Sequence, residues 1–544
     1  MYVNKRYNLL KQERVIFLRT VKALNDFWRF TKLPAGMNIS KDNIISPEYE
    51  DASWQPVVLP HTYNSEDGAG RMAASDGGDY YRGTVCYRRN LALSSEECCG
   101  KELYLEFEGA NTVAEVYING RFAGEHSGGY SAFRFDITDY IYLDKDNLIA
   151  VIVSNAPTDY IAPITDNGDF TKMGGLYRGV KLIAVEPVHI ALKDSGSCGV
   201  YITPRNISET SADIGILVKL DKAETAEVKA AILDPHGNLE TELFGRTDKD
   251  RITLSGKINC PKLWNGVNSP GLYRAEITLF CNGEPVDSIE QEFGIRSYRI
   301  DADNGFFLNG KPYPLHGVSR HQDRKGLGNA ITHEMHDEDM ALIRELGANT
   351  VRLAHYQHDQ YFYDLCDKYG MVVWAEIPYI SEHLPNGREN TISQMKELIH
   401  QNYNHPSIVC WGVSNEITIS TKDKADMLDN HRVLNELCHK MDPTRLTTLA
   451  CYAMCGPFNS VAHITDLVSW NLYLGWYVPG LFLNDLWMGF FHLVYPNRPL
   501  GFSEYGAEGM PNLHSSKPRR GDHTEEYQAK YHEYMLRCFD RHKR

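Results

Sequence analysis

The sequence predicts a multidomain protein in which two β-sandwiches precede a parallel α/β barrel. Its 544 residues are enough for about three to five domains of roughly 100–200 residues each. Short runs that alternate apolar and polar residues, separated by frequent turn signals, dominate as far as residue 297. Beyond that position strand-like and helix-like segments take turns, which is typical of a parallel sheet with crossover helices.

The composition excludes several classes of protein. Lys and Arg total 56 against 71 Asp and Glu, so the net charge is −15, which disfavours a nucleic-acid partner. The N-terminus lacks the apolar core of a signal peptide, and no apolar run approaches the roughly 20 residues of a membrane span. Twelve scattered cysteines without zinc-ligand spacing indicate reduced thiols. We therefore expect a cytoplasmic protein without a membrane partner, and the sequence leaves its oligomeric state open, a homo-oligomer included.

Two successive groups of short alternating runs predict the two sandwiches. In the first group the clearest runs are 103–108, 114–118, 148–153 and 180–183. In the second group, which begins near residue 187, they are 216–220, 227–233 and 275–280. Asp234-Pro235-His236-Gly237 predicts a hairpin turn between two runs of the second group.

The region after residue 297 contains seven strand-like segments, most of them followed by a helix. The predicted strands are 315–318, 350–353, 371–376, 407–413, 446–449, 467–470 and 499–502. The predicted helices are 337–346, 360–369, 393–403, 424–441, one within 481–494, and 524–541. This repetition indicates a (β/α)₈ barrel. A doubly wound open sheet is the alternative, but no glycine-rich phosphate turn follows the first strand.

Two carboxylates stand at the mouths of facing barrel strands. Functional groups of such barrels lie at the carboxyl ends of the strands, where Glu416 follows the fourth strand and Glu504 the seventh. Paired carboxylates suit glycoside hydrolysis, and a retaining mechanism needs them about 5–5.5 Å apart. The alternative is that each is a solvated or salt-bridged glutamate, which is the usual state of an isolated one.

Polar and aromatic side chains near these carboxylates favour the catalytic interpretation. Asn415 offers a donor to a sugar hydroxyl, and Tyr473 offers a hydrogen bond that keeps a carboxylate nucleophile ionised. Others provide aromatic faces, donors or positive charge for a sugar: Trp476, Tyr477, His321, Arg352 and His355. Taken singly, a histidine or tryptophan of this kind is more often structural.

Longer motifs resemble those of a known family. In the barrel half they are GVSRHQD, VRLAHYQHDQYFYDLCDKYGMVVWAEIP, HPSIVCWGVSNE, WNLYLGWY and FSEYG. In the N-terminal half they are WQPVVLPHTYN, VYINGRFAGEHSGGYSAFRFDIT and GGLYRGV. Their order resembles glycoside hydrolase family 2, which contains β-galactosidases, β-glucuronidases and β-mannosidases. The resemblance implies a jelly-roll sugar-binding-like domain at 1–186, an immunoglobulin-like sandwich at 187–297 and a TIM barrel at 298–544.

The resemblance also implies residue roles. Glu416 is expected to be the general acid/base and Glu504 the nucleophile, with Asn415 on the sugar 2-hydroxyl and Tyr473 on the nucleophile. Asp169, in DFTKMGGLYR, resembles an acidic residue that a jelly-roll loop sends into the active site. The remaining matches line the innermost sugar subsite: His321, Arg352 and His355.

The implied activity is hydrolysis of terminal β-D-galactosides of small carbohydrates by a retaining exo-glycosidase. GVSRHQD and LAHYQH favour the galactosidase branch. The alternative within the family is a β-glucuronidase, which grips the sugar carboxylate with an Asn-x-Lys motif that would lie beyond residue 544. We expect no cofactor and no metal, because EIPYISEH after the third strand does not match the Glu/His spacing of family magnesium sites.

A different class of function is a sugar-binding chain without turnover. Few residues follow Glu504, so the eighth strand and its helix are absent from the expected barrel. An open barrel exposes strand edges and apolar side chains, and it is less stable than a closed one.

Overall fold

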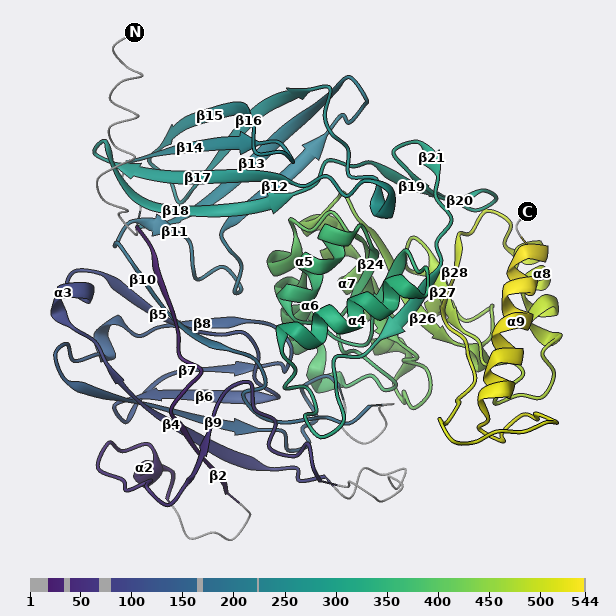
Figure 1. The fold of residues 1–544 in the computed structure, drawn as a ribbon, viewed down its shortest axis with the longest axis horizontal. Helices are drawn as coiled ribbons and strands as arrows, with labels where there is room; N and C mark the ends of the chain where they lie inside the picture. The colour runs from purple at the N-terminus through teal and green to yellow at the C-terminus, as the bar shows by residue number, and fades with distance from the viewer. Residues whose placement is uncertain (1–17, 34–39, 68–79, 164–169, 223–224, 543–544) are drawn as a thin grey trace.

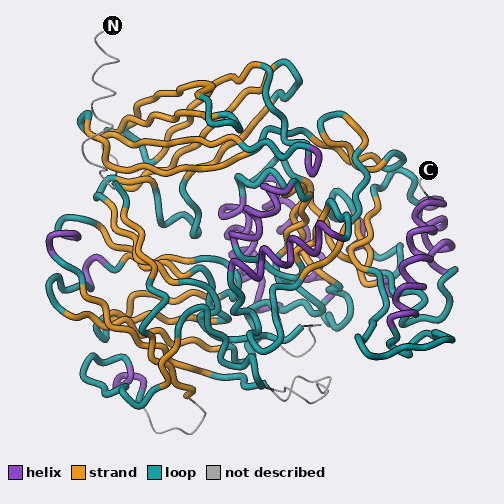
Figure 2. The backbone as a smooth tube through the Cα atoms, viewed as in Figure 1, coloured by secondary structure: helices purple, strands orange, loops and turns teal. Residues whose placement is uncertain are grey.

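The protein contains two β-sandwich domains packed beside an α/β barrel (Figure 1). The computed structural model describes residues 18–33, 40–67, 80–163, 170–222 and 225–542. Strands make up most of the N-terminal half, whereas the longer helices gather around the barrel (Figure 2). No described helix combines the length and apolarity that crossing a membrane requires. All twelve cysteines are free thiols.

The first domain is a sandwich of a four-stranded and a six-stranded antiparallel sheet. Its alternating strands turn apolar side chains inward, and Trp28, Tyr87 and Phe107 are fully buried between the sheets. The first sheet orders β1 (Thr20–Ala23), β10 (Val180–Val185), β5 (Glu102–Phe107) and β8 (Phe133–Asp136). The second orders β3 (Gln55–Val57), β2 (Trp28–Leu33), β4 (Thr84–Ala92), β9 (Asp146–Ser154), β6 (Val113–Ile118) and β7 (Arg121–Ser127). Two short helices, α2 (Lys41–Ile44) and α3 (Ser95–Cys98), lie in its loops.

The second domain is a smaller sandwich whose strands alternate strictly between buried and solvent-facing residues. One sheet contains β11 (His189–Ile190), β13 (Ser211–Asp221), β12 (Val200–Arg205) and β16 (Arg251–Asn259). The other orders β15 (Leu239–Thr247), β14 (Ala226–Leu233), β17 (Tyr273–Cys281) and β18 (Glu284–Phe293). The predicted hairpin turn joins β14 to β15, and the Asp234 carboxylate accepts the backbone N–H groups of His236 and Asn238, both at 2.8 Å.

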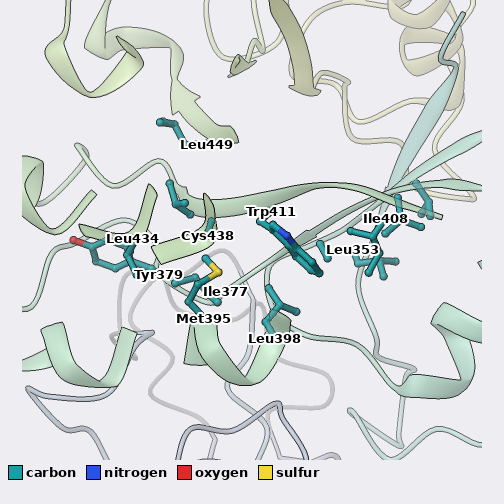
Figure 3. Packing of buried hydrophobic residues seen from close by; sticks show 14 of the residues in the cluster. Leu353, Ile377, Tyr379, Met395, Leu398, Ile408, Trp411, Leu434, Cys438 and Leu449 are labelled. Carbon is teal, nitrogen blue, oxygen red and sulfur yellow. The ribbon is translucent and has the colours of Figure 1, made fainter. Parts of the chain in front are cut away.

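Seven parallel strands in sequence order form the barrel sheet. They are β22 (Gly317–Arg320), β23 (Thr350–Leu353), β24 (Val372–Glu376), β25 (Ile408–Asn415), β26 (Leu446–Tyr452), β27 (Val468–Asn471) and β28 (Leu500–Glu504). The helices are α4 (His333–Glu345), α5 (Gln360–Tyr369), α6 (Arg388–Asn402), α7 (Lys424–Met441), α8 (Leu483–Val494) and α9 (Glu525–Arg541). Strands β19 (Tyr298–Asp301), β20 (Gly305–Leu308) and β21 (Lys311–Pro312) lead into it. Helix side chains such as Met395 and Leu398 pack with Trp411 of β25 in its core (Figure 3).

The predicted fold class, including an incomplete barrel, is confirmed. The sheet is nearly closed, and β22 and β28 are its first and last strands. The Ser319 hydroxyl of β22 donates to the Ser503 carbonyl of β28 at 3.2 Å, a side-chain contact between two strands that are not paired by backbone hydrogen bonds. Glu504 therefore sits on an edge strand of the sheet.

Arg178 of the first domain ties that domain to the barrel. Its guanidinium donates to the carbonyls of Glu108 and Tyr130 within the jelly roll. It also donates to Gln322 Oε1 at 3.3 Å and to the Gln357 carbonyl at 2.9 Å, in the loops after β22 and β23. A buried guanidinium with this many acceptors fixes the two loops against the sandwich.

Candidate active site

Glu504, the last residue of β28, is held by donors on strand β23 and on the loop after β27. Its Oε1 accepts from Arg352 Nη1 at 2.5 Å, and its Oε2 accepts from the Tyr473 hydroxyl at 2.7 Å. His355 Nε2 lies 3.6 Å from Oε1. Burial alone raises the pKa of Glu504, but the charge of Arg352, together with His355 and the Tyr473 hydrogen bond, lowers it below its ordinary value. The carboxylate is therefore ionised at neutral pH.

Arg352 is kept in place by Glu376, a buried carboxylate at the end of β24. Arg352 Nε and Nη2 donate to the two oxygens of Glu376 at 3.0 and 2.9 Å, a bidentate ion pair. His355 Nδ1 lies 2.8 Å from Glu376 Oε1. Because Arg352 contacts Glu376 and Glu504 at once, the guanidinium links the end of β24 to the end of β28.

Glu416 follows β25 directly, at the carboxyl end of the same sheet. Its left-handed φ of 48° turns the chain away from the strand, while its N–H still donates to the Ala450 carbonyl of β26 at 2.8 Å. Its Oε1 accepts from Asn471 Nδ2, a neutral amide donor, at 2.9 Å. The Asn471 amide also donates to Asn415 Oδ1, which accepts from Arg352. Because Arg352 also donates to Glu504, a chain of hydrogen bonds connects the two carboxylates.

Asn415 presents a donor for which the described residues provide no acceptor. Its Oδ1 accepts from Arg352 Nη2 at 2.8 Å and from Asn471 Nδ2 at 3.2 Å, which fixes the orientation of the amide. Its Nδ2 is buried without a hydrogen-bond partner among the described residues. Because burying an unpaired donor costs free energy, this atom is suited to a ligand hydroxyl.

His321 and His355 line the jelly-roll side of the site. The rings of His321 and His355 lie 5.1 Å apart, and Phe170 of the first domain packs on both. Burial, assisted by the charges of His355 and Arg352, lowers the pKa of His321 to about 3. His321 therefore acts as a neutral hydrogen-bonding group and not as the positive charge that the sequence suggested. Asp169 lies outside the described residues.

The two aromatic candidates of the loop after β27 have different surroundings. Tyr477 is exposed, and its ring lies 5.2 Å from that of Tyr473, so it presents a face at the edge of the site. Trp476 is buried and packs against His523 and Tyr527, 5.1 and 6.0 Å away between ring centres. In this structure Trp476 belongs to the packing of α9, and its contact with sugar stays a prediction.

Comparisons with known proteins match this architecture. The TIM barrel domain of glycosyl hydrolases family 2 matches residues 300–544, and the sugar binding domain of the family matches residues 21–186. A further model, described as glycosyl hydrolases family 2, matches residues 188–296. A β-glucuronidase of Bacteroides fragilis is 38% identical over 503 residues, covering 88% of this chain and 69% of that protein. The chain belongs to glycosyl hydrolase family 2.

Two further relatives are similar to most of this chain. A crystal structure of Bacteroides uniformis β-glucuronidase superposes with a TM-score of 0.89 and 37% identity, covering 96% of this chain and 63% of that one. A β-galactosidase of Thermoanaerobacter pseudethanolicus is 32% identical over 418 residues, covering 74% of this chain and 52% of that protein. This family 2 chain thus spans between about half and about two thirds of the length of these relatives.

Three residues of this family 2 site were not singled out from the sequence. Glu376 ends a predicted strand in WAEIP, and its position at the carboxyl end was the available signal. Asn471 likewise ends β27, where it donates to Glu416 and accepts from the Ser503 hydroxyl at 2.6 Å. Phe170 directly follows Asp169 in the sequence, and only its contact with His321 of the barrel, made between two domains, identifies it as a site residue.

Glu376 and His383, the first and last residues of EIPYISEH, do not converge on a metal position. Glu376 is paired with Arg352, whereas His383 Nε2 lies 2.7 Å from Asp426. Among the described residues, one group of potential ligand atoms lies within 4.8 Å of one another, on α8 and at the C-terminal end of α9: Asp485, Cys538 and His542. The residues of the site itself therefore do not fit a magnesium ion bound by Glu376 and His383.

Proposed function

We propose that this chain carries the catalytic centre of a retaining β-glycosidase, with Glu504 as nucleophile and Glu416 as general acid/base. The observation that carries the proposal is the unequal environment of the two carboxylates. Glu504 is bound by a guanidinium and a phenol that favour its ionised form. Glu416 accepts from the Asn471 amide, a neutral donor that favours the ionised form of a carboxyl group less strongly than a guanidinium does.

The geometry supports a two-step displacement. In the first step the Glu504 carboxylate forms a bond to the anomeric carbon, while Glu416 donates its proton to the departing glycosidic oxygen. In the second step Glu416 accepts a proton from water as the water oxygen displaces Glu504 from the sugar. Asn415 Nδ2 is placed to donate to a hydroxyl of the same sugar.

A β-D-glucuronide is the better supported substrate. The Bacteroides fragilis relative at 38% identity and the Bacteroides uniformis structure at 37% are both named β-glucuronidases. The Thermoanaerobacter β-galactosidase matches less of the chain, at 32% identity. The galactoside preference expected from GVSRHQD and LAHYQH thus has less support, and we carry it as the second candidate.

A panel of substrates tests the proposal. The 4-nitrophenyl β-glycosides of glucuronic acid, galactose and mannose are assayed with the full chain, and faster release of nitrophenol from the glucuronide is expected. A higher kcat/KM for the galactoside than for the glucuronide would make the β-D-galactoside the preferred substrate. If none of the three is hydrolysed while titration calorimetry detects binding of glucuronate, the non-catalytic sugar-binding interpretation replaces the proposal.

Tyr473→Phe is expected to move the acidic limb of the pH profile of kcat/KM to higher pH. The hydrogen bond from the Tyr473 hydroxyl lowers the pKa of Glu504, so removing the hydroxyl raises that pKa. A larger fraction of Glu504 is then protonated at any given pH. We also expect kcat/KM at the optimum to fall about 10²-fold, the order of magnitude for losing one donor to reacting charge. Tyr477→Phe is the matched control. An acidic limb that stays in place, or that moves to lower pH, contradicts the role given to Tyr473.

Treatment with EDTA is expected to leave activity unchanged. Glu376 and His383 have protein partners of their own, so no metal is needed to balance the Glu376 charge. Activity is measured after dialysis against EDTA and again after adding Mg²⁺. Loss of activity that Mg²⁺ restores would show that the site uses a metal after all.

A further inference from the structure

Helix α8 carries apolar side chains on two opposite faces. One face is buried against the rest of the protein and includes Met488 and Phe491. On the other face four large apolar residues are 45% to 79% exposed, with Gly489 among them: Phe482, Leu486, Phe490 and Leu493. Their spacings of three and four residues place them on one side of the helix. We call these four residues and Gly489 the α8 stripe.

Helix α7 of the same barrel shows the usual arrangement of a surface helix. It buries Met427, Leu434 and Cys438 and turns charged residues to solvent: Asp429, Arg432, Glu436 and Lys440. Over its described length, Leu483–Val494, α8 has no charged residue at an exposed position. A helix that only covers the barrel core does not need a second apolar face, so the α8 stripe requires another explanation.

The α8 stripe is large enough for a protein interface. Phe458, which is 67% exposed, extends it, since the rings of Phe458 and Phe490 lie 6.1 Å apart. Together these side chains expose roughly 600 Å² of apolar surface, if a large side chain offers about 150–250 Å² in all. Stable interfaces bury about 600–1,000 Å² on each partner, and a patch of this size is uncommon on a monomer.

The surroundings of α8 leave the stripe open to a partner. Figure 1 shows α8 at the outer edge of the barrel, beside α9 and away from both sandwiches. The acidic residue that borders the stripe is Asp485, and Arg541 of α9 donates to its two oxygens at 2.9 and 2.7 Å. The charge at this border is thus already compensated within the chain, so it does not oppose an apolar contact.

A second copy of this chain fits the stripe. Two copies of net charge −15 repel each other, and the repulsion is weakest where uncharged surfaces meet. A two-fold axis brings the same patch together from both copies, which an uncharged stripe permits. Beyond its own helical turn, a Cβ at Gly489 would meet only the His542 ring among the described residues, at 3.8 Å. The α8 backbone is therefore accessible to close approach by another helix.

We propose that this chain forms a dimer in which the α8 stripes of two copies pack against each other around a two-fold axis near Gly489. Each copy would remove the exposed apolar surface of the other from water. This inference concerns assembly and does not depend on the proposed function, because neither catalytic carboxylate belongs to the stripe.

Sedimentation velocity of the full chain over a wide range of concentrations tests the proposal. The wild-type chain is expected to reach twice its mass of 61.8 kDa. Leu486→Glu and Leu493→Glu should each raise the dimer Kd about 100-fold or more, because each change places two like charges, one from each copy, in an apolar contact. Leu342→Glu, at a 60% exposed leucine of α4, is the matched control and should keep the wild-type Kd.

Gly489→Cys tests the position of the axis without adding a charge. A short bis-maleimide should link two copies of this variant, because the two-fold axis brings the introduced thiols together. Glu436→Cys, at an exposed position of α7, should give no more linked dimer than the wild-type chain, whose Cys99 and Cys260 are already exposed.

Three results would overturn the proposal. The first is a wild-type chain that stays monomeric at every concentration, and its binding to phosphatidylcholine vesicles would then assign the stripe to a lipid surface. The second is a dimer whose Kd is unchanged in both α8 leucine variants, since its interface must then lie elsewhere. The third is Gly489→Cys that dimerises without being linked above the wild-type background. Urea unfolding at the wild-type midpoint shows that each variant is folded.

Discussion

Glu504→Gln is expected to reduce kcat for an aryl glycoside by about 10⁴-fold or more, the scale on which removing a nucleophile acts in other enzymes. Glutamine nearly matches glutamate in shape, so the hydrogen bond from Tyr473 and the packing of β28 can persist. The amide cannot form the covalent ester at the anomeric carbon, however. Steady-state hydrolysis of the preferred 4-nitrophenyl glycoside gives the measurement.

Glu508→Gln is the matched control for this prediction. Glu508 lies four positions after Glu504, is exposed and is paired with His523 at 3.0 Å, so the same change there should leave kcat near the wild-type value. A 2-deoxy-2-fluoro glycoside with a good leaving group should slow the second step and leave a sugar attached to the peptide that contains Glu504. Attachment to another residue, or near wild-type turnover by Glu504→Gln, would remove Glu504 from the role of nucleophile.

Arg352→Met is expected to lower the free energy of unfolding by about 3–5 kcal/mol and to abolish turnover. Both members of the Arg352–Glu376 pair are buried, and removing one partner of a buried ion pair leaves the other charge uncompensated. Glu504 loses its closest cation at the same time, so its pKa rises and less of it is ionised at a given pH. Urea unfolding followed by tryptophan fluorescence measures the stability.

The double variant Arg352→Met/Glu376→Gln distinguishes charge from packing. Since glutamine removes the uncompensated charge, the double variant should regain a substantial part of the lost free energy, yet stay inactive because Arg352 is missing from Glu504. A double variant as unstable as Arg352→Met would mean that the loss comes from packing. Recovery of activity in it would mean that Arg352 does not position the nucleophile.

Helices with clear end signals could be predicted from the sequence to the residue. Helix α5 begins after Asp359, whose carboxylate accepts the Tyr361 N–H, and ends at Gly370 with a left-handed φ of 75°. Helix α7 begins after Asp423 in the same way. Helix α4 starts four residues before its prediction, because its first turn is polar and carries no apolar period. Helix α6 likewise starts five residues early, at Arg388.

The two candidate carboxylates could be found from the sequence because each ends a barrel strand, whereas the contacts that hold them could not. Glu416 and Glu504 each end an apolar run, and the barrel brings such ends together. The partners of Arg352 are 24 and 152 residues away in sequence, at Glu376 and Glu504. No spacing rule connects positions so far apart, since the tertiary fold decides which buried charges meet. Trp476 is the opposite case. It lies in the loop after β27, where the sequence predicted an aromatic face for a sugar, but its ring packs against Tyr527 of α9.

The Arg178 contacts make the candidate active site part of a two-domain unit. The guanidinium holds Gln322 and the Gln357 carbonyl, which lie one and two residues beyond His321 and His355. The jelly roll therefore cannot unfold without releasing the loops that carry both histidines. By thermodynamic linkage, a ligand that binds only the assembled site shifts the folding equilibrium of both domains, so part of its binding energy protects a sandwich that lies outside the barrel.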